Sequence, residues 1–179
     1  MRLDERTAFA NNNKADLFIS LHANGAVAAG PSGAQVLTLA AEGYSTVTPP
    51  NAAPAVSLPV FGGGARSIEI IPWDTAQLRW LGDSERLAGL VHAELGARVP
   101  MHSRGLDKAA LRVLIGANMP AVLVETGFLT NADQEKALAT DTLQNEIVEA
   151  LVGAIIRYRD GQSAAQATAP GATPGVVAR

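Results

Sequence analysis

The chain of 179 residues contains no cysteine, few aromatic residues and no long apolar run. Without cysteine, it has no disulfide bonds, thiolate metal sites or cysteine nucleophiles. Aromatic residues make up only 4% of the chain, which argues against a surface that binds nucleic acid by stacking its bases. The net charge of -3 offers no electrostatic attraction to nucleic acid or to an anionic membrane. Since no apolar run approaches the roughly 20 residues that a membrane-spanning helix needs, we expect no membrane span.

The first residues, Met1 to Arg6, are charged and helix-like, so we do not expect them to form a signal peptide. Such a start fits a cytoplasmic protein, or a parent protein whose true N-terminus lies further upstream. With 47% hydrophobic and 17% charged residues, most of the chain is expected to fold. Its length predicts one domain with a sizeable core.

Strand-like and helix-like segments alternate along the chain, which predicts an α/β fold whose mostly parallel, or mixed, sheet is flanked by helices. Residues 161–179 are rich in Ala, Gly, Pro, Thr and Ser, and we expect them to form a disordered tail. The predicted strands are 16–22, 34–39, 111–115 and 121–125. The predicted helices are about 3–14, about 75–97 with a capping box of Asp74 and Gln77, one that begins at Asn131, and about 141–159.

The segment 40–66 is rich in proline and glycine and predicts a long irregular loop. It is either a lid at the rim of a substrate site or a flexible surface insertion. Its run Gly62-Gly63-Gly64 lacks the strand–helix context and the Lys-Ser/Thr pair of a phosphate-binding loop.

Two polar residues, His22 and Glu125, each close an apolar strand-like run. A carboxylate in such a position is costly unless it is paired, hydrogen-bonded or close to a metal. In parallel sheets ligands bind beyond the carboxyl ends of the strands, which makes this pair a candidate site. The alternatives are a structural strand-end histidine and a glutamate that caps a helix or organises the loop near Gly127 and Asn131.

The other candidate residues carry weaker signals. His92 lies inside a predicted helix, which favours a packing or solvent-facing role. His102 lies in the polar segment 101–105, which we expect to be a loop, and there it either lines a site or is solvated. Arg104 and Arg112 either contact an anionic substrate or form ordinary surface ion pairs.

Three segments resemble the family-3, zinc-dependent N-acetylmuramoyl-L-alanine amidases, which are bacterial cell-wall hydrolases. The first, Leu3 to Asn24, contains Lys14-Ala15-Asp16-Leu17-Phe18-Ile19-Ser20-Leu21-His22-Ala23-Asn24 and is similar to the family's K-A-D-L-F-I-S-I-H-A-N. The second, Met119 to Asn131, is similar to M-P-A-V-L-V-E-I-G-F-L-S-N, and the third is the closing helix, Gln144 to Tyr158. The resemblance implies an amidase catalytic domain over 1–160, of which 40–72 is less typical.

The resemblance implies that two histidines and a glutamate hold zinc and that a further glutamate is catalytic. The second histidine corresponds to His22 and the catalytic glutamate to Glu125. The first histidine belongs to a D-x-G-H-G-G motif that is absent from this sequence. We expect this histidine and the glutamate ligand to lie upstream of Met1. The chain would then be the C-terminal two-thirds of a phosphorylase/hydrolase-like amidase fold without its first strand and helix.

By resemblance, the substrate is peptidoglycan, and zinc-activated water cleaves the amide between N-acetylmuramic acid and L-alanine. The location implied is periplasmic or extracellular. With two zinc ligands missing and a sheet edge uncovered, we expect the 179 residues alone to be inactive and weakly stable. The alternatives are a non-catalytic amidase-like module that binds the cell wall or a partner, and a different zinc amidohydrolase on the same scaffold.

Overall fold

The computed structural model describes residues 1–28, 30–41, 55–59, 61–69 and 71–168. Within these residues a four-stranded sheet with strand order β1-β6-β2-β5 lies at the centre of the fold. β1 pairs with β6 and β2 with β5 in parallel, whereas β2 and β6 are antiparallel. The predicted α/β class is therefore confirmed, with a mixed sheet. The strands are β1 Phe18–Asn24, β2 Ala34–Leu39, β5 Met101–Ala109 and β6 Ala121–Phe128.

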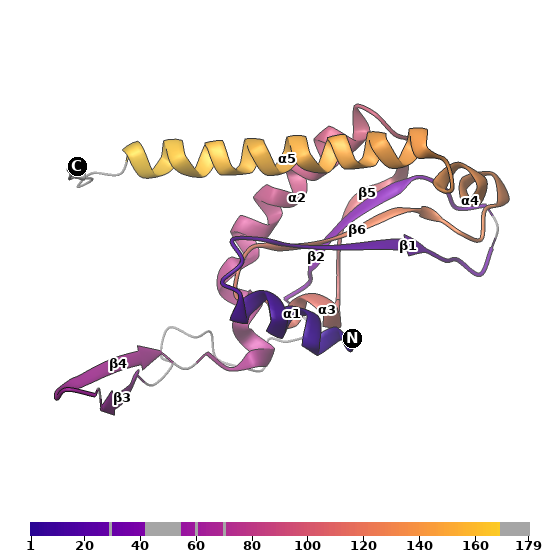
Figure 1. Ribbon diagram of the computed structural model, residues 1–179. Helices are drawn as coiled ribbons and strands as arrows, with labels where there is room; N and C mark the ends of the chain where they lie inside the picture. The colour runs from indigo at the N-terminus through magenta and orange to yellow at the C-terminus, as the bar shows by residue number, and fades with distance from the viewer. Residues whose placement is uncertain (29, 42–54, 60, 70, 169–179) are drawn as a thin grey trace.

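Helices cover both faces of the sheet, α2 and α5 on one face and α1 and α3 on the other (Figure 1). No described helix is both long and apolar enough to cross a membrane. The helices are α1 Leu3–Asn12, the 3-10 helix η1 Trp73–Trp80, α2 Leu81–Gly96, α3 Arg112–Ile115, α4 Ala132–Leu138 and α5 Asp141–Thr168. The strands β3 Ala55–Pro59 and β4 Ala65–Glu69 form a separate antiparallel hairpin.

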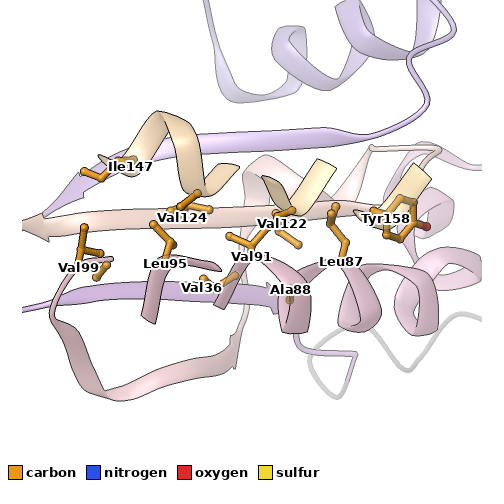
Figure 2. Close-up of a cluster of buried hydrophobic side chains, with 13 residues drawn as sticks. Val36, Leu87, Ala88, Val91, Leu95, Val99, Val122, Val124, Ile147 and Tyr158 are labelled. Atoms are coloured by element: carbon orange, nitrogen blue, oxygen red, sulfur yellow. The ribbon is translucent and has the colours of Figure 1, made fainter. Parts of the chain in front are cut away.

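Strand β6 is buried on both faces because its side chains alternate between two hydrophobic clusters. Val122 and Val124 pack against α2 and α5, as Figure 2 shows. Ala121 and Leu123 face the opposite way, into the cluster with α1 and α3. This explains why 121–124 reads as a continuous apolar run rather than an alternating one.

The secondary structure predicted for two segments between α2 and β6 was wrong. The apolar run 111–115 forms the short helix α3 instead of a strand, because one helical turn buries Val113, Leu114 and Ile115 together. Short apolar runs do not distinguish a strand from a buried helical turn. The polar segment 101–105, expected to be a loop, begins β5. It is polar because β5 is an edge strand of the sheet and pairs with β2 alone among the described strands.

Helix starts and ends were predicted with mixed success. Asn131 caps α4 as expected, since its side chain accepts hydrogen bonds from the backbone N–H groups of Asp133 and Gln134. The capping box of Asp74 and Gln77 was wrong, because η1 follows Pro72 without a side-chain cap and Gln77 is buried in a tertiary hydrogen-bond network.

Two segments are more regular than predicted. The irregular loop expected over 40–66 contains β3 and the start of β4, while 42–54 and 60 lie outside the described residues. Helix α5 continues through Thr168 instead of ending near residue 159, and so enters the segment expected to be disordered. Residues 169–179 lie outside the described residues.

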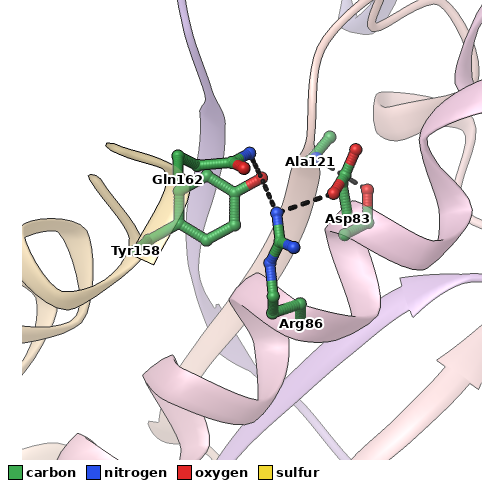
Figure 3. Close-up of polar contacts among 6 residues, drawn as sticks. Asp83, Arg86, Ala121, Tyr158 and Gln162 are labelled. Carbon is green, nitrogen blue, oxygen red and sulfur yellow. Dashed lines mark hydrogen bonds and ion pairs between the residues drawn. The ribbon is translucent and has the colours of Figure 1, made fainter. Parts of the chain in front are cut away.

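Polar contacts join α2 to α5 at the edge of the larger cluster (Figure 3). The Arg86 guanidinium donates to Asp83 at 2.7 Å and to the Tyr158 hydroxyl at 3.3 Å. It also lies 5.1 Å from the centroid of the Tyr158 ring. The amide of Gln162 donates to the same hydroxyl at 2.9 Å. The buried Tyr158 hydroxyl thus has partners on both helices.

A buried hydrogen-bond network holds the beginning of β6. The Ser84 hydroxyl accepts from the Ala121 backbone N–H at 2.9 Å and lies 2.6 Å from the amide of Gln77. When the Gln77 side chain is oriented with its amide oxygen toward Ser84, that oxygen accepts from the Ser84 hydroxyl. The amide nitrogen of Gln77 then donates to the backbone carbonyls of Ala117 at 2.9 Å and Met119 at 3.1 Å. Ser84 is completely buried, so every one of these groups depends on the others for its partners.

Replacing Ser84 with alanine should lower the free energy of unfolding by about 1–3 kcal/mol, because buried polar groups lose their partner. Urea denaturation followed by circular dichroism measures the change. The matched control is Ser163→Ala on the exposed part of α5, expected to change the free energy by less than about 0.5 kcal/mol. Equal effects of the two substitutions would contradict the structural role of Ser84.

Candidate functional site

Three polar residues form one row across three adjacent strands. His22 on β1 and Glu125 on β6 are direct partners in the parallel pair. Gln35 on β2 is the partner of Glu125 in the antiparallel pair. Residues paired in register point to the same face of a sheet, and Leu123, two residues before Glu125, packs with α1 and α3. The row His22-Glu125-Gln35 therefore lies on this face.

The row lies at an irregularity in the pairing of β1 with β6. The register shifts after the His22–Glu125 pair, so that Asn24 pairs with Phe128. The Thr126 hydroxyl donates to the His22 carbonyl at 3.0 Å and secures this shift. His22 and Glu125 both lie toward the carboxyl ends of their strands, as predicted, although neither is the last residue of its strand. Bulges of this kind often re-aim side chains next to active sites.

Glu125 is only partly buried as a residue, yet its Oε2 atom is fully buried and has no hydrogen-bond partner among the described residues. Burial raises the pKa of the Glu125 carboxyl above its ordinary value. Buried polar atoms without a partner are rare, and carboxyls with a perturbed pKa are enriched at functional sites. This arrangement favours a chemical role over the loop-organising alternative.

The orientation of His22 is set by its own strand. Its Nε2 atom lies 2.7 Å from the hydroxyl of Ser20, which is buried and two residues earlier on the same face. The imidazole of His22 remains partly exposed. This hydrogen bond holds the ring beside Glu125 while leaving part of it accessible.

On the far side of Gln35, strand β5 makes a large bulge. Ala34 pairs with Met101 and Val36 pairs with Leu106, so residues 102–105 all lie opposite Gln35. The Gln35 amide donates to the Arg104 carbonyl at 2.8 Å. We refer to His102, Ser103, Arg104 and Gly105 as the β5 bulge.

The structure places the weaker candidates in or near this bulge, with one exception. His102 packs its ring on Phe128, with centroids 5.3 Å apart. His92, on α2, lies beneath Gly105, where an added Cβ would come within 2.8 Å of its Nε2; this supports a packing role. Arg104 is 75% exposed and lies 3.6 Å from Asp107. Arg112 lies exposed on α3 and does not join the row.

Helix α4 ties the strands of the site together. The Gln134 side-chain oxygen accepts from the backbone N–H groups of Gly33 at 3.0 Å and Phe128 at 2.9 Å. Gly33 has φ +96°, and a Cβ there would lie 2.4 Å from the backbone nitrogen of His102. Glycine is therefore required where the start of β2 meets the β5 bulge.

Sequence reasoning missed the supporting residues Ser20, Gln35, Thr126 and Gln134. Two of them carried a detectable signal. Gln35 is a long polar side chain inside the apolar strand 34–39, and Ser20 precedes His22 by two residues and so shares its face. The hydrogen bonds of Thr126 and Gln134 depend on contacts between distant segments and carried no comparable signal.

Within the part of the chain that the structure describes, no three His, Cys, Asp or Glu side chains lie close enough to hold a metal ion. A catalytic zinc site uses three protein ligands and keeps one position for water. The row supplies one imidazole and one carboxylate. The described residues by themselves therefore do not fit a complete zinc site.

The fold is that of an amidase catalytic domain. It superposes on the amidase Ami1 from Mycobacterium smegmatis with a TM-score of 0.64 and 22% identity, covering 89% of this chain and 61% of that one. It superposes on the catalytic domain of CwlV from Bacillus (Paenibacillus) polymyxa with a TM-score of 0.61 and 23% identity. This match covers 89% of this chain and 66% of that one.

The sequence identifies the family within this class. Residues 1–157 match the N-acetylmuramoyl-L-alanine amidase family, and the chain belongs to it. It is 32% identical to the amidase AmiC from Escherichia coli O6:H1 over 170 residues, which are 92% of this chain and 41% of that protein. It is 30% identical to AmiA from Salmonella typhimurium, covering 87% of this chain and 56% of that protein. The chain thus spans about half the length of these relatives, or less.

Replacing Glu125 with glutamine should stabilise the fold at neutral pH, because burial disfavours the charged carboxylate. A carboxyl whose pKa is raised on folding binds its proton more tightly in the folded state. Its ionisation therefore destabilises the fold as the pH rises above the ordinary value of 4.5. The stability advantage of Glu125→Gln should be largest near neutral pH and disappear below about pH 4.5.

The measurement is urea denaturation across this pH range with a chelator present, so that stray metal does not bind Glu125. The exposed Glu149→Gln on α5 is the matched control and should show no such trend. A constant difference between wild type and Glu125→Gln at all pH values would contradict the prediction.

Proposed function

We propose that this protein hydrolyses peptidoglycan at the amide between the lactyl group of N-acetylmuramic acid and L-alanine of the stem peptide. The observation that carries the proposal concerns Glu125, which lies beside His22 in a chain of the amidase family. Its buried Oε2 atom has no hydrogen-bond partner among the described residues. A carboxyl with a raised pKa is a stronger base than an ordinary glutamate, which suits it to accept a proton from water.

In the proposed reaction Glu125 moves one proton in two steps. It removes a proton from water while the water oxygen bonds to the scissile carbonyl carbon. It then gives that proton to the amide nitrogen as the carbon–nitrogen bond breaks. The products are a carboxyl on the lactyl group and a free amino group on L-alanine, so that one water molecule is consumed for each bond.

We propose His22 as a zinc ligand, the role that the family resemblance assigns to it. Its partly exposed imidazole next to Glu125 supports this assignment. The described residues do not bring together the further ligands of a three-ligand site. We therefore expect the 179 residues alone to bind zinc poorly. Because peptidoglycan lies outside the cytoplasmic membrane, we propose a periplasmic or extracellular location.

A second function is a non-catalytic, amidase-like module that binds the cell wall. The observation in its favour is that no described cluster could hold a metal ion. The presence of both His22 and Glu125 in one row favours the enzyme.

The deciding experiment is hydrolysis of purified peptidoglycan by the protein produced from its natural gene, with zinc supplied. Released peptides that begin with L-alanine are quantified by mass spectrometry. We expect release by the natural protein and a loss of at least about 100-fold in Glu125→Gln, since a general base contributes about 10²–10⁴-fold. The isolated 179-residue chain should release almost nothing.

The Glu149→Gln variant serves as the control and should keep full activity. Binding to peptidoglycan without hydrolysis by the natural protein would favour the non-catalytic module. Robust zinc-dependent release by the 179-residue chain, lost in Glu125→Gln, would overturn the expectation that this chain lacks a complete site.

A further inference from the structure

A hollow of about 630 Å³ lies between α5, the end of η1 and the two residues that lead into β1. Its volume is within the range that is usual for small-molecule sites. The lining residues on which its chemistry depends are Asp16, Leu17, Trp80, Ile155 and Tyr158. Apolar and polar side chains therefore meet in one concave surface, which suits a ligand that has both kinds of surface.

This hollow is separate from the row. His22 is five residues after Leu17, which places it about 16 Å further along the direction of β1. Leu17 packs against the cluster with α2 and α5, whereas the row lies on the opposite face of the sheet. None of the three row residues lines the hollow. A ligand bound here would leave the row free.

The hydroxyl of Tyr158 has a proton to donate. Tyr158 is only 5% exposed, and its oxygen accepts from the Arg86 guanidinium at 3.3 Å and from the Gln162 amide at 2.9 Å. A phenol oxygen that accepts two hydrogen bonds still carries its own O–H group, and this group has no acceptor among the described residues. The charge of Arg86 makes it a stronger donor, because linked hydrogen bonds polarise one another. A ligand carbonyl would satisfy it.

Asp16 and Trp80 offer an acceptor and a flat apolar surface. The Asp16 side chain is exposed, and its carboxylate makes no hydrogen bond or ion pair with the described residues. The Trp80 indole N–H donates to Asn118 at 3.1 Å, which restrains the ring and leaves its carbon atoms for apolar contact. Leu17 and Ile155, both partly buried, add apolar surface.

We propose that this hollow binds an N-acetylhexosamine unit of a glycan. A hexose ring has an apolar face of C–H groups that suits Trp80, and hydroxyl groups that suit the Asp16 carboxylate. Its acetamido carbonyl is the acceptor for the Tyr158 hydroxyl. The substrate proposed above contains such a sugar, N-acetylmuramic acid, so the hollow would hold the protein on the polymer that it cleaves. The inference does not depend on the chemistry at Glu125.

The test compares two soluble sugars, triacetylchitotriose, which consists of three N-acetylglucosamine units, and cellotriose, which lacks the acetamido groups. Neither contains the lactyl–alanine amide of the proposed reaction. Affinities are measured by NMR titration of the 179-residue chain. We expect triacetylchitotriose to bind about fivefold more tightly than cellotriose, the preference that one additional hydrogen bond gives. The resonances that shift should belong to residues of the hollow.

Tyr158→Phe removes the hydroxyl and keeps the ring. It should abolish the preference for triacetylchitotriose while changing the affinity for cellotriose less than about twofold. A purely structural hydroxyl would instead lower both affinities together. Asp16→Asn, at an exposed position where the fold is not at risk, should weaken the binding of both sugars about threefold, because a charged acceptor is lost.

Trp80→Ala should weaken the binding of both sugars about fivefold, because the apolar contact with the ring is lost. Trp73→Ala is the matched control, since Trp73 lies on the same 3-10 helix and is exposed but does not line the hollow. It should keep both affinities. Thermal denaturation confirms that each variant is folded.

Glu125→Gln should bind triacetylchitotriose as the wild-type chain does, which separates the hollow from the row. Four results would overturn this inference: no binding of either sugar, equal affinity for both, a preference that survives in Tyr158→Phe, or affinities unchanged by both Asp16→Asn and Trp80→Ala. Shifts confined to resonances of the row would overturn it as well. All of these results leave the proposed hydrolysis standing, because hydrolysis is measured separately on peptidoglycan.

Discussion

The pairing of β6 with β1 on one side and β2 on the other is the constraint on which the rest of the structure depends. Because β6 is buried on both faces, its register cannot slip without moving an apolar side chain out of one cluster or the other. The same register sets His22 and Gln35 on either side of Glu125. Packing of the core and geometry of the site are therefore consequences of one arrangement.

Polar side chains connect the site to the scaffold at each irregular point. Gln134 joins the start of β2 to the end of β6, Gln35 holds the β5 bulge, and Thr126 secures the register shift. Each satisfies backbone groups that irregular strand pairing leaves without a ladder partner. The oxygen of Glu125 differs from these atoms because no described group satisfies it, and this difference supports the catalytic role that we propose for the carboxylate.

Strongly patterned segments were predictable from the sequence, and weakly patterned ones were not. Helix α1, strand β2, the cap at Asn131 and the apolar course of β6 follow from local patterns, and the structure confirms them. Strand β5 was missed because edge strands have no second partner and tolerate polar residues. Helix α3 was mistaken for a strand because its length is within the range of both. His22 and Glu125 were found as polar ends of apolar runs, whereas Gln35 and the β5 bulge were not found.

The sequence by itself determined the family, the class of fold and the two residues most suited to chemistry, because motifs and periodicity are local properties of the chain. Only the tertiary structure decided that these residues are direct register partners, that Gln35 completes their row and that Arg104 lies beyond it. The physical reason is that strand order, register and bulges arise from pairing between segments about a hundred residues apart. Burial of the Glu125 oxygen, and the raised pKa that follows, likewise exist only once those segments meet.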